Sequence, residues 1–293
     1  MSGMIESILV TGAAGLVGRH VTERLRSRGV HVVAHARRAG PGIDWAVDLT
    51  DPRALHDPMR FDVAAVVHCA AAIPARSDNF DRDNTIASAT LAAALSAAKS
   101  LRRIVHLSSV SVYQQPATDR WLIDEDAPTV DGDVSDGSYA ASKRAAERSL
   151  DFVRQDKPDV AVTHLRASSI YGPGMVGTTL LPILVARAQR NEPLVMRGPR
   201  PYRQNFIHVA DVAELAVALV QENRSPAVVN AFSDDTHEIA ALAELVRTRL
   251  GSCSRIVDES YAGRGPEPVF VNRIAKRLHP FFRSLADHLS DAS

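Results

Sequence analysis

Several residue types that mark particular protein classes are scarce in this 293-residue chain. Its two cysteines, Cys69 and Cys253, lie in unrelated surroundings, which argues against a disulfide framework or cysteine zinc site and suits a reducing cytosol. Its 34 basic and 34 acidic residues cancel, so the basic excess typical of nucleic-acid binding is missing. No apolar run approaches a membrane span, and no basic region precedes an apolar stretch at the start. We therefore expect a cytoplasmic protein without nucleic-acid or membrane partners.

Two common catalytic patterns are also missing. The chain has no GxSxG elbow, which argues against a hydrolase, and no HExxH pair. Its eleven histidines are scattered and form no close cluster with acids, so we expect no metal. His68 stands in an apolar run and is interpreted as a packed core histidine.

The first half of the chain alternates between short apolar runs and helical patterns. The expected strands are 7–12, 30–36, 61–71, 102–113 and 160–168, and the expected helices are 16–29, 78–100 and 139–155. Strands that alternate with helices predict an α/β fold, here a Rossmann-like, doubly wound parallel sheet with helices on both sides.

The rhythm changes after Tyr171. Helical patterns at 179–190, 210–222 and 236–250 and short apolar pieces at 193–197, 205–209 and 227–231 do not extend a regular βαβ series. We predict an NAD(P)-binding domain over 1–170, which later segments rejoin, and a smaller, partly interleaved substrate-binding lobe over 171–293. Segment 114–137 is expected to be a long loop, and such loops are usually functional or mobile.

The segment TGAAGLVG places Gly12, Gly15 and Gly18 between the first expected strand and the first expected helix. Glycines there permit a tight turn and a close approach of the backbone to a pyrophosphate, and the helix N-terminus favours the negative charge. The alternative is a glycine-rich turn without a ligand. The strand–glycine–helix context favours a dinucleotide site.

The end of the second expected strand reads VVAHARRAG and holds no acidic residue. In NAD-binding sites an acid at this place meets the ribose 2′-hydroxyl. Here His35, Arg37 and Arg38 take its place, and a guanidinium suits a 2′-phosphate. An exposed basic loop is the alternative. The pattern favours NADP(H), with NAD(H) possible.

Tyr139 and Lys143 stand four residues apart in the helical segment DGSYAASKRAAERSL. Residues at this spacing are neighbours on a helix. A cation beside a phenol lowers the tyrosine pKa from its usual value of about 10. Such a tyrosine can exchange a proton with a substrate oxygen near neutral pH. A solvated surface pair is the alternative.

Seven motifs in order resemble the extended short-chain dehydrogenase/reductase superfamily, in its NAD(P)-dependent nucleotide-sugar epimerase, dehydratase and ketoreductase branch. The motifs are TGAAGLVG (11–18), DLTD (48–51), HCAA (68–71), LSSVSVY (107–113), YAASK (139–143), LRASSIYGPG (165–174) and NFIHVADVAELA (205–216). The resemblance covers almost the whole chain. It implies a homodimer that pairs through the helices at 78–100 and 139–155, where alanine is frequent.

The resemblance also implies a role for individual residues. Tyr139 matches the catalytic acid and base, Lys143 the residue that holds the nicotinamide ribose and lowers the tyrosine pKa, and Ser109 their hydroxyl partner. Asn84 matches a helix asparagine of the family, with a structural role as the alternative. The cofactor would meet Gly12, Gly15, Leu16, Val17, Gly18, Arg37, Arg38, Asp48, Leu49, Ala70, Ala71 and Lys143, with Asp48 at the adenine amine.

The substrate side departs from the family pattern. The usual tract GxGxxxRDF is here MRGPRPYRQNFIHV, so Gln204 stands where the family has its arginine. Arg203 is the candidate that replaces it at the substrate diphosphate; the alternatives are Arg200, Arg197 or a substrate that lacks a nucleotide. Tyr171 and Ser111 are further substrate candidates; Ser111 would share a strand face with Ser109. The acidic pair of STDEVY is absent, since Val110 and Ser111 stand there, which counts against a 4,6-dehydratase.

These observations predict an NADP(H)-dependent oxidoreductase that reduces the keto group of a nucleotide-linked sugar or similar polar carbonyl. One alternative is an NAD-dependent nucleotide-sugar epimerase. Another, from a different class, is a non-catalytic dinucleotide sensor on the same fold. The intact set of Ser109, Tyr139 and Lys143 argues against the sensor.

Overall fold

The computed structural model describes residues 7–55, 62–74, 79–133, 135, 137–175, 179–200, 202–222, 225–262 and 267–292. The chain forms two compact units, and each is built from three separate segments. Unit 1 comprises Met1–Tyr113, Pro128–Arg166 and Val212–Val229. Unit 2 comprises Gln114–Ala127, Ala167–Asp211 and Asn230–Ser293.

A seven-stranded sheet with the order β11-β7-β5-β4-β1-β2-β3 organises unit 1. Its strands are β1 (Ser7–Thr11), β2 (His31–Ala36), β3 (Trp45–Ala46), β4 (Ala65–His68), β5 (Arg103–Ser109), β7 (Ala161–Ala167) and β11 (Val228–Ala231). β1 pairs in parallel with β2 and with β4, β2 with β3, and β4 with β5. The doubly wound parallel sheet that the sequence predicts is confirmed.

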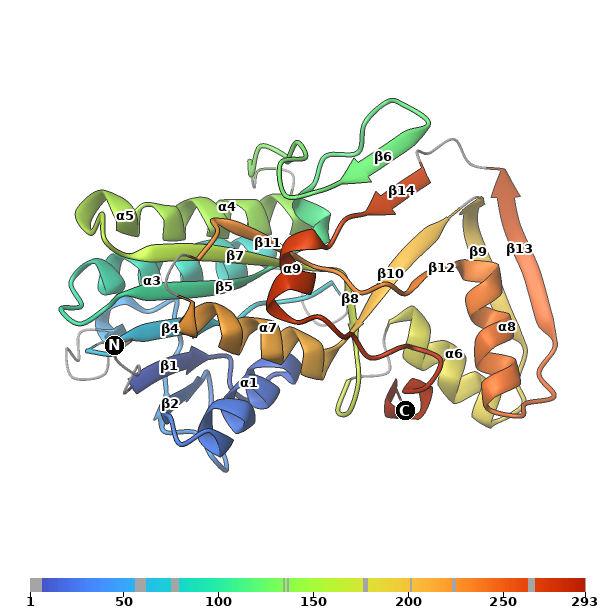
Figure 1. Ribbon diagram of the computed structural model, residues 1–293, viewed down its shortest axis with the longest axis horizontal. Coiled ribbons are helices and arrows are strands. Elements are labelled where there is room, and N and C mark those ends of the chain that lie inside the picture. Colours follow the sequence, from blue (N-terminus) through green and yellow to red (C-terminus); the bar gives the residue numbers. More distant parts are fainter. Residues whose placement is uncertain are drawn as a thin grey trace. The chain divides into compact units, whose positions relative to one another are not determined.

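Helices cover both faces of this sheet (Figure 1). α3 (Ala87–Ser96) and α4 (Tyr139–Asp151) lie on one face, and α1 (Leu16–Ser27) and α7 (Val209–Gln221) on the other. The short helix α5 (Val153–Asp156) follows α4, and the 3-10 turn η1 (Pro52–Leu55) follows β3. The strands are mostly apolar on both faces because helices bury both, although polar residues such as His106 and His164 are buried among them. One core cluster joins the sheet to α3 and α4 through Leu9, Val66, Ile104, Val162, Leu91, Leu95 and Leu150.

Two elements of unit 1 differ from the sequence prediction. The strand expected over 102–113 ends at Ser109, whose side chain accepts a hydrogen bond from the Ser111 amide and caps the 3-10 turn η3 (Val110–Val112). The helix expected from 78 begins with the π-helical turn η2 (Asp81–Ile86). At this turn the Asn84 side chain bonds to the backbone of Ala72, a tertiary contact that helical periodicity cannot reveal.

In the described part of unit 2, the main elements are three small sheets and two helices. The sheets pair β12 (Thr236–Glu238) with β10 (Arg203–His208) and β8 (Ser169–Tyr171), β13 (Ile256–Ala262) with β9 (Leu194–Arg200), and β14 (Glu267–Phe270) with β6 (Arg120–Ile123). The helices are α6 (Leu180–Gln189) and α8 (Ile239–Arg249), followed by α9 (Arg273–Leu278) and the 3-10 turn η5 (Leu289–Ala292). Their core includes Tyr171, Leu184, Phe206 and Leu242.

The segment expected to be a long loop, 114–137, holds a strand. β6 pairs in parallel with β14, so Arg120 lies opposite Glu267 and Ile123 opposite Phe270. Ile123 is fully buried, whereas Leu122 on the other side of the strand is exposed. The polar composition of the segment conceals this strand because its partner comes from much later in the chain.

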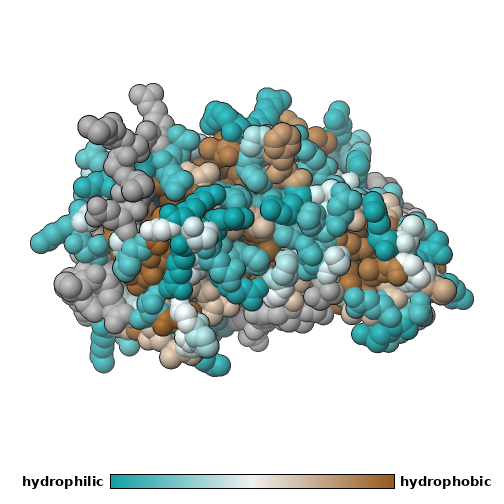
Figure 2. All heavy atoms as spheres, turned by 60° about the horizontal axis from the view of Figure 1, so that its bottom comes forward, coloured by the Kyte–Doolittle hydropathy of each residue, from teal (hydrophilic) through white to brown (hydrophobic). Residues whose placement is uncertain are grey.

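The surface is mixed in polarity. Figure 2 shows one face on which hydrophilic side chains predominate and apolar ones form small groups between them. Among the described residues, no helix is both long enough and apolar enough to cross a membrane.

Candidate active site

The glycine turn after β1 brings two stretches of backbone unusually close together. Gly12 has a φ of 68°, and a Cβ on it would lie 2.6 Å from the backbone nitrogen of Ala70. A Cβ on Gly18 would lie 2.2 Å from the carbonyl oxygen of Gly12. Side chains at these positions would therefore force the β1 turn, α1 and the end of β4 apart.

The N-terminus of α1 is open to an anion. Gly15 caps this helix with no side-chain hydrogen bond, and the first turn contains no acidic residue. The turn lies at the carboxyl ends of β1 and β4, between which the strand order reverses, and this is where sheets of this kind bind nucleotides. These residues fit the pyrophosphate of a dinucleotide.

The remaining sequence-predicted cofactor residues near this turn differ in exposure. Val17 and Leu49 belong to the buried core, Leu16 and Ala70 are half-buried, and Ala71 is exposed. The first two therefore shape the turn and the adjoining loop by packing, and the other three are accessible.

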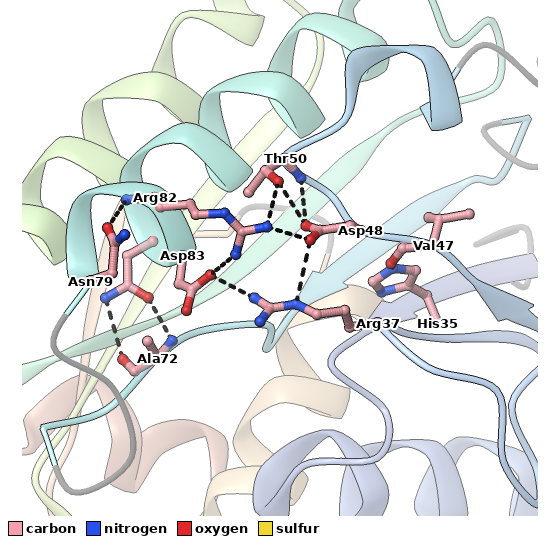
Figure 3. Close-up of polar contacts among 10 residues, drawn as sticks. His35, Arg37, Val47, Asp48, Thr50, Ala72, Asn79, Arg82 and Asp83 are labelled. Atoms are coloured by element: carbon pink, nitrogen blue, oxygen red, sulfur yellow. Dashed lines mark hydrogen bonds and ion pairs between the residues drawn. The ribbon is translucent and has the colours of Figure 1, made fainter.

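Two arginines and two aspartates form a compact ion-pair network beside the end of β2 (Figure 3). Arg82 donates to Asp48 at 2.6 Å and to Asp83 at 2.8 Å. Arg37 donates to the same Asp83 oxygen at 2.7 Å, and its Nε lies 3.8 Å from Asp48. Half of the Arg37 side chain, 51%, remains exposed. Arg37 and Asp48, which the sequence predicts separately as cofactor contacts, thus lie in one network. Arg82 and Asp83, which link them, were not predicted as site residues.

The pKa of Asp48 reflects this network. Burial acts to raise it, but hydrogen bonds from Thr50 and Arg82 outweigh burial and lower the pKa to about 2. Asp48 is therefore a carboxylate near neutral pH, with acceptor capacity for an amine. Arg82 and Asp83 were not predicted as site residues, because their only mark in the sequence is the charged run DRDN ahead of an apolar helix.

The other two basic residues at the end of β2 lie apart from the network. His35 is buried, contacts the carbonyl oxygen of Val47 through Nε2 at 3.1 Å, and packs edge-on against Trp45. Burial lowers its pKa to about 4, so it is neutral. Arg38 is exposed.

Ser109 and Tyr139 are brought together by β5 and α4. Ser138 caps α4 by accepting a hydrogen bond from the Ala141 amide at 3.0 Å, so the helix begins at Tyr139. Burial raises the pKa of Tyr139, and a hydrogen bond with Ser109 opposes that rise. Ser111 donates to the Ser109 oxygen at 2.9 Å, so it lies beside this pair through the 3-10 turn rather than through a shared strand face.

Lys143 lies one helical turn after Tyr139 and is only 2% exposed. Its ammonium donates to the carbonyl oxygen of Leu107 at 2.7 Å and lies 3.2 Å from Nε2 of His106. Burial lowers its pKa to about 8, while the charge of the Glu147 carboxylate acts in the opposite direction. The ammonium therefore contacts residues of β5 rather than the Tyr139 phenol. The lowered pKa that the sequence predicts for Tyr139 is not found in the protein alone, where burial raises it.

Asn84 ties the cofactor side of the site to α4. Its Oδ1 accepts from the Ala72 amide at 2.7 Å, and its Nδ2 donates to the Ser142 hydroxyl at 3.0 Å. Asn84 is 1% exposed, so these bonds satisfy a buried amide. The structural role that the sequence left open for it is the one that these contacts support.

Unit 2 holds the two remaining predicted substrate residues. Tyr171 is fully buried, packs against His208, and its hydroxyl faces the Arg283 carbonyl oxygen at 3.5 Å. This geometry supports a packing role. Arg203 is exposed and pairs with Glu267 at 2.7 Å. Its neighbour Gln204 donates to the Ser169 hydroxyl.

One group in unit 2 has the composition of a metal site. Among the described residues, potential ligand atoms of His208, His288 and Asp291 lie within 4.8 Å of one another. The Ala210 amide, however, donates to Nδ1 of His208 at 3.2 Å. A neutral ring that accepts at Nδ1 carries its proton on Nε2, the atom that faces Asp291 at 3.3 Å. The group therefore acts as an internal tie between β10 and the 3-10 turn η5.

The fold and the glycine turn together define an NAD(P)-dependent enzyme of the extended short-chain dehydrogenase/reductase class. The family described as the NAD dependent epimerase/dehydratase family matches residues 8–231, and the chain belongs to this family.

Individual proteins resemble the chain at low identity. It is 25% identical over 273 residues to the dTDP-4-dehydro-6-deoxy-D-allose reductase of Streptomyces bikiniensis, which covers 85% of this chain and 83% of the relative. It is 30% identical over 220 residues to the ceramide reductase of Caulobacter vibrioides, which covers 72% and 60%, respectively. A solved structure of MoeE5 in complex with UDP-glucose and NAD superimposes with a TM-score of 0.78 at 26% identity, over 98% of this chain and 97% of that one.

Proposed function

We propose that this protein reduces the keto group of a nucleotide-linked sugar, with NADPH as the preferred cofactor. The observation that carries the proposal is the grouping of three side chains where β5 meets α4: Ser109, which accepts from the Ser111 hydroxyl at 2.9 Å, Tyr139 at the start of α4, and the Lys143 ammonium one helical turn further on. This is a hydroxyl, a proton donor and a cation in one place, which is what the reduction of a carbonyl requires. The Streptomyces relative acts on a substrate of the same class.

The roles follow from the chemistry of each side chain. The bound nicotinamide supplies the hydride. Ser109 donates a hydrogen bond to the substrate carbonyl oxygen, and Ser111, which donates to Ser109, orients its hydroxyl. Tyr139 transfers its proton to that oxygen. Lys143 holds the nicotinamide ribose, and its charge favours the tyrosinate that remains.

The NADPH preference rests on Arg37. Its guanidinium is half exposed and lies against Asp83, so a 2′-phosphate gains a charge-assisted contact if it replaces one carboxylate. Arg82 contacts both carboxylates, so each of them keeps one guanidinium partner when Arg37 turns to the phosphate. Arg38 is an exposed second candidate.

An epimerase with a retained NAD is the second candidate function. It is favoured by the same network, because Asp48 and Asp83 already neutralise both arginines. The carboxylates then stand near the ribose, where they accept hydrogen bonds from its hydroxyls and repel a phosphate. A dinucleotide sensor is a weaker candidate, because Ser109, Tyr139 and Lys143 are all present.

In this proposal the two units have different roles. Unit 1 carries every residue assigned to the cofactor and to proton transfer. Unit 2 recognises the substrate, with Arg203 as the candidate for its diphosphate, which is the role that the sequence suggests for the lobe over 171–293. Tyr171 would act there through packing.

A homodimer is the proposed assembly. α3 packs against α4 within unit 1. Ile86, at the start of α3, and Phe152, at the end of α4, are 43% and 59% exposed. A second copy that pairs through these helices would cover both side chains.

The test is direct. Purified protein would be assayed with a panel of nucleotide-linked 4-keto sugars and the matching alcohols, with NADPH and NADH followed through their absorbance. Stoichiometric NADPH consumption with a keto sugar supports the reductase. Purified protein that retains NAD and interconverts two sugar alcohols without net consumption of cofactor supports the epimerase. Tight cofactor binding with no turnover of any sugar would support the sensor.

A further inference from the structure

A line of side chains leads from Lys143 to the edge of unit 1. His106 Nε2 lies 3.2 Å from Lys143 Nζ, and His106 Nδ1 lies 3.3 Å from Nδ1 of His164. His164 Nε2 in turn lies 3.4 Å from Oδ1 of Asp151. Lys143, His106 and His164 are buried, at 2%, 0% and 3% exposure, whereas the Asp151 side chain is 34% exposed. The chain of contacts thus connects the buried ammonium to a surface carboxylate.

Each contact in this line determines which ring nitrogen of the next histidine carries its proton. An ammonium has only donors, so Nε2 of His106 must accept. A neutral imidazole carries one proton, which places the His106 proton on Nδ1, where it faces His164. Nδ1 of His164 must then accept, which places its proton on Nε2, toward Asp151. All the N–H groups therefore point outward, from Lys143 to the carboxylate.

The reversed arrangement is unfavourable at both ends. It would turn an N–H of His106 toward the Lys143 ammonium and a lone pair of His164 toward the Asp151 carboxylate. A donor would then face a donor at one end and an acceptor would face an acceptor at the other, in a buried line where such repulsion is poorly screened. The carboxylate at one end and the ammonium at the other therefore select the same pair of tautomers.

We propose that Asp151, His164 and His106 are positioning residues for Lys143: the carboxylate fixes the tautomer of His164, which fixes the tautomer of His106, which presents a lone pair to the ammonium. Two of the three Lys143 donors are then held by His106 and Leu107. The third is left to point at the cofactor ribose, and this consequence rests on the proposed function.

Other ionisable groups lie around the line from Lys143 to Asp151. Lys143 also faces the Glu147 carboxylate on its own helix and, at the end of β4, the Cys69 thiol, which burial keeps neutral. The rings of His68 and His164 lie beside that of His106. Burial lowers the pKa of His106 well below its usual value, and the positive charges of Lys143 and of Arg166 on β7 act in the same direction. His106 is therefore neutral, as the proposed tautomer requires. His68 stacks on His106 but bonds to Thr11 and Ser88, outside the line.

Asp151 is the group that can be changed without disturbing the interior. Burial raises its pKa, but the contact with His164 outweighs burial and lowers it, so it is a carboxylate near neutral pH. It also pairs with Arg154 at 3.0 Å. Asp156, on the next helical segment, is exposed and supplies a matched control.

The first experiment reads the tautomers directly. Long-range ¹H–¹⁵N correlation spectra of the full-length protein distinguish Nδ1–H from Nε2–H rings among the eleven histidines, and His106→Gln and His164→Gln variants assign the two signals. We expect an Nδ1–H ring for His106 and an Nε2–H ring for His164. An Nε2–H ring at His106 overturns the proposal.

The second experiment titrates Lys143 in protein labelled at lysine Cε. The sequence has only four lysines, Lys99, Lys143, Lys157 and Lys276, so the signals are readily assigned. We expect a midpoint near pH 8 in the wild type. His164→Leu should lower it by about one pH unit, tenfold in proton affinity, because His106 can then turn its N–H toward the ammonium.

Two substitutions of Asp151 separate tautomer control from simple charge attraction. Asp151→Ala should lower the midpoint, whereas Asp151→Asn, which keeps an oxygen beside Nε2 of His164, should leave it near the wild-type value, as should Asp156→Ala. If Asp151→Asn shifts the midpoint as far as Asp151→Ala, charge alone acts and the proposal fails. It also fails if neither Asp151→Ala nor His164→Leu has an effect. These titrations need no cofactor or substrate, so their outcome is independent of whether the protein is a reductase.

Discussion

Arg166 and Glu147 form a two-point ion pair inside unit 1. Nε of Arg166 lies 2.9 Å from Oε1 of Glu147, and Nη2 lies 2.8 Å from Oε2. Ser108 donates to the same carboxylate at 2.6 Å, and the guanidinium lies 4.8 Å from the centre of the Tyr113 ring. A single fully buried carboxylate thus joins β5, β7 and α4, one helical turn from Lys143.

Loss of this carboxylate should destabilise the protein strongly. Glu147→Gln leaves the buried Arg166 without a counter-charge, so we expect the free energy of unfolding to fall by about 3–5 kcal/mol, measured by urea denaturation. Asp131→Asn is the control, because Asp131 is 98% exposed and only 3.6 Å from Arg148. It should cost less than about 1 kcal/mol. If the free energy of unfolding fell equally in the two variants, the buried ion pair would contribute no more to stability than the exposed one, against this prediction.

Tyr139→Phe should abolish most of the turnover and leave cofactor affinity nearly unchanged. The ring keeps its edge-on contact with Phe80, and only the proton donor is lost. A missing general acid lowers the rate by about 10²- to 10⁴-fold. Steady-state rates and calorimetric titration with the reduced cofactor measure the two effects. Tyr261→Phe, at an exposed position, is the control, and wild-type activity in Tyr139→Phe would refute the catalytic assignment.

Lys143 should make the stability depend on pH in the alkaline range. Its folded pKa of about 8 lies below the ordinary value of 10.5, so the unfolded chain binds more protons between these values. The free energy of unfolding therefore rises with pH across this range, by at most about 1.4 kcal/mol per pH unit. The contribution is complete above pH 10.5 and is lost as the pH falls through 8.

The matched variants for this prediction are Lys143→Met and Lys99→Met. Urea unfolding at several values of pH should show that Lys143→Met lacks the rise seen in the wild type, while Lys99→Met, at an exposed position, retains it. Parallel curves for wild type and Lys143→Met would mean that burial does not shift this group. Lys143→Met should also lose cofactor affinity and turnover together.

NADPH should bind more tightly than NADH, and Arg37→Ala should remove the difference. Hydrogen bonds between charged groups contribute about 1.5–3 kcal/mol, which corresponds to roughly ten- to hundredfold in affinity. Calorimetric titration with both reduced cofactors measures the effect, and Arg53→Ala, an exposed arginine of η1, is the control. Equal affinities in the wild type would instead place the epimerase ahead of the reductase.

The proposed dimer predicts a specific change in mass. Light scattering at micromolar concentration should give twice the chain mass for the wild type. Ile86→Asp and Phe152→Asp place a charge in the proposed helical interface and should give monomers. Leu122→Asp changes an equally exposed apolar residue outside these helices and should not. A monomeric wild type would contradict the prediction.

Much of the cofactor side could be predicted because its signals are local. The glycines stand between a strand and a helix that the sequence shows separately, and Gly12 needs the positive φ that glycine adopts easily. The spacing of Tyr139 and Lys143 likewise places both on α4. Patterns of this kind depend on neighbours in the sequence, which a single chain reveals.

The missed features depend on partners far along the chain. Arg82 was not predicted because its partner Asp48 lies in the loop after β3, far from η2 in the sequence. His106 and His164 were not singled out, because only the pairing of β5 with β7 sets their rings beside each other. The strand expected to reach Tyr113 stops at Ser109 because a serine side chain there bonds to the next turn.

The pairing of β6 with β14 has a consequence for the order in which the protein is made. These two strands lie about half of the chain apart, and neither has another partner among the described strands. Closing so long a loop is entropically costly, and a parallel pair cannot form until both strands exist. During synthesis, Arg120–Ile123 must therefore wait, unpaired, until Phe270 has left the ribosome. Translation thus makes this ladder one of the last parts of the protein to assemble, well after the strands β1, β2 and β4 around the glycine turn are available to pair.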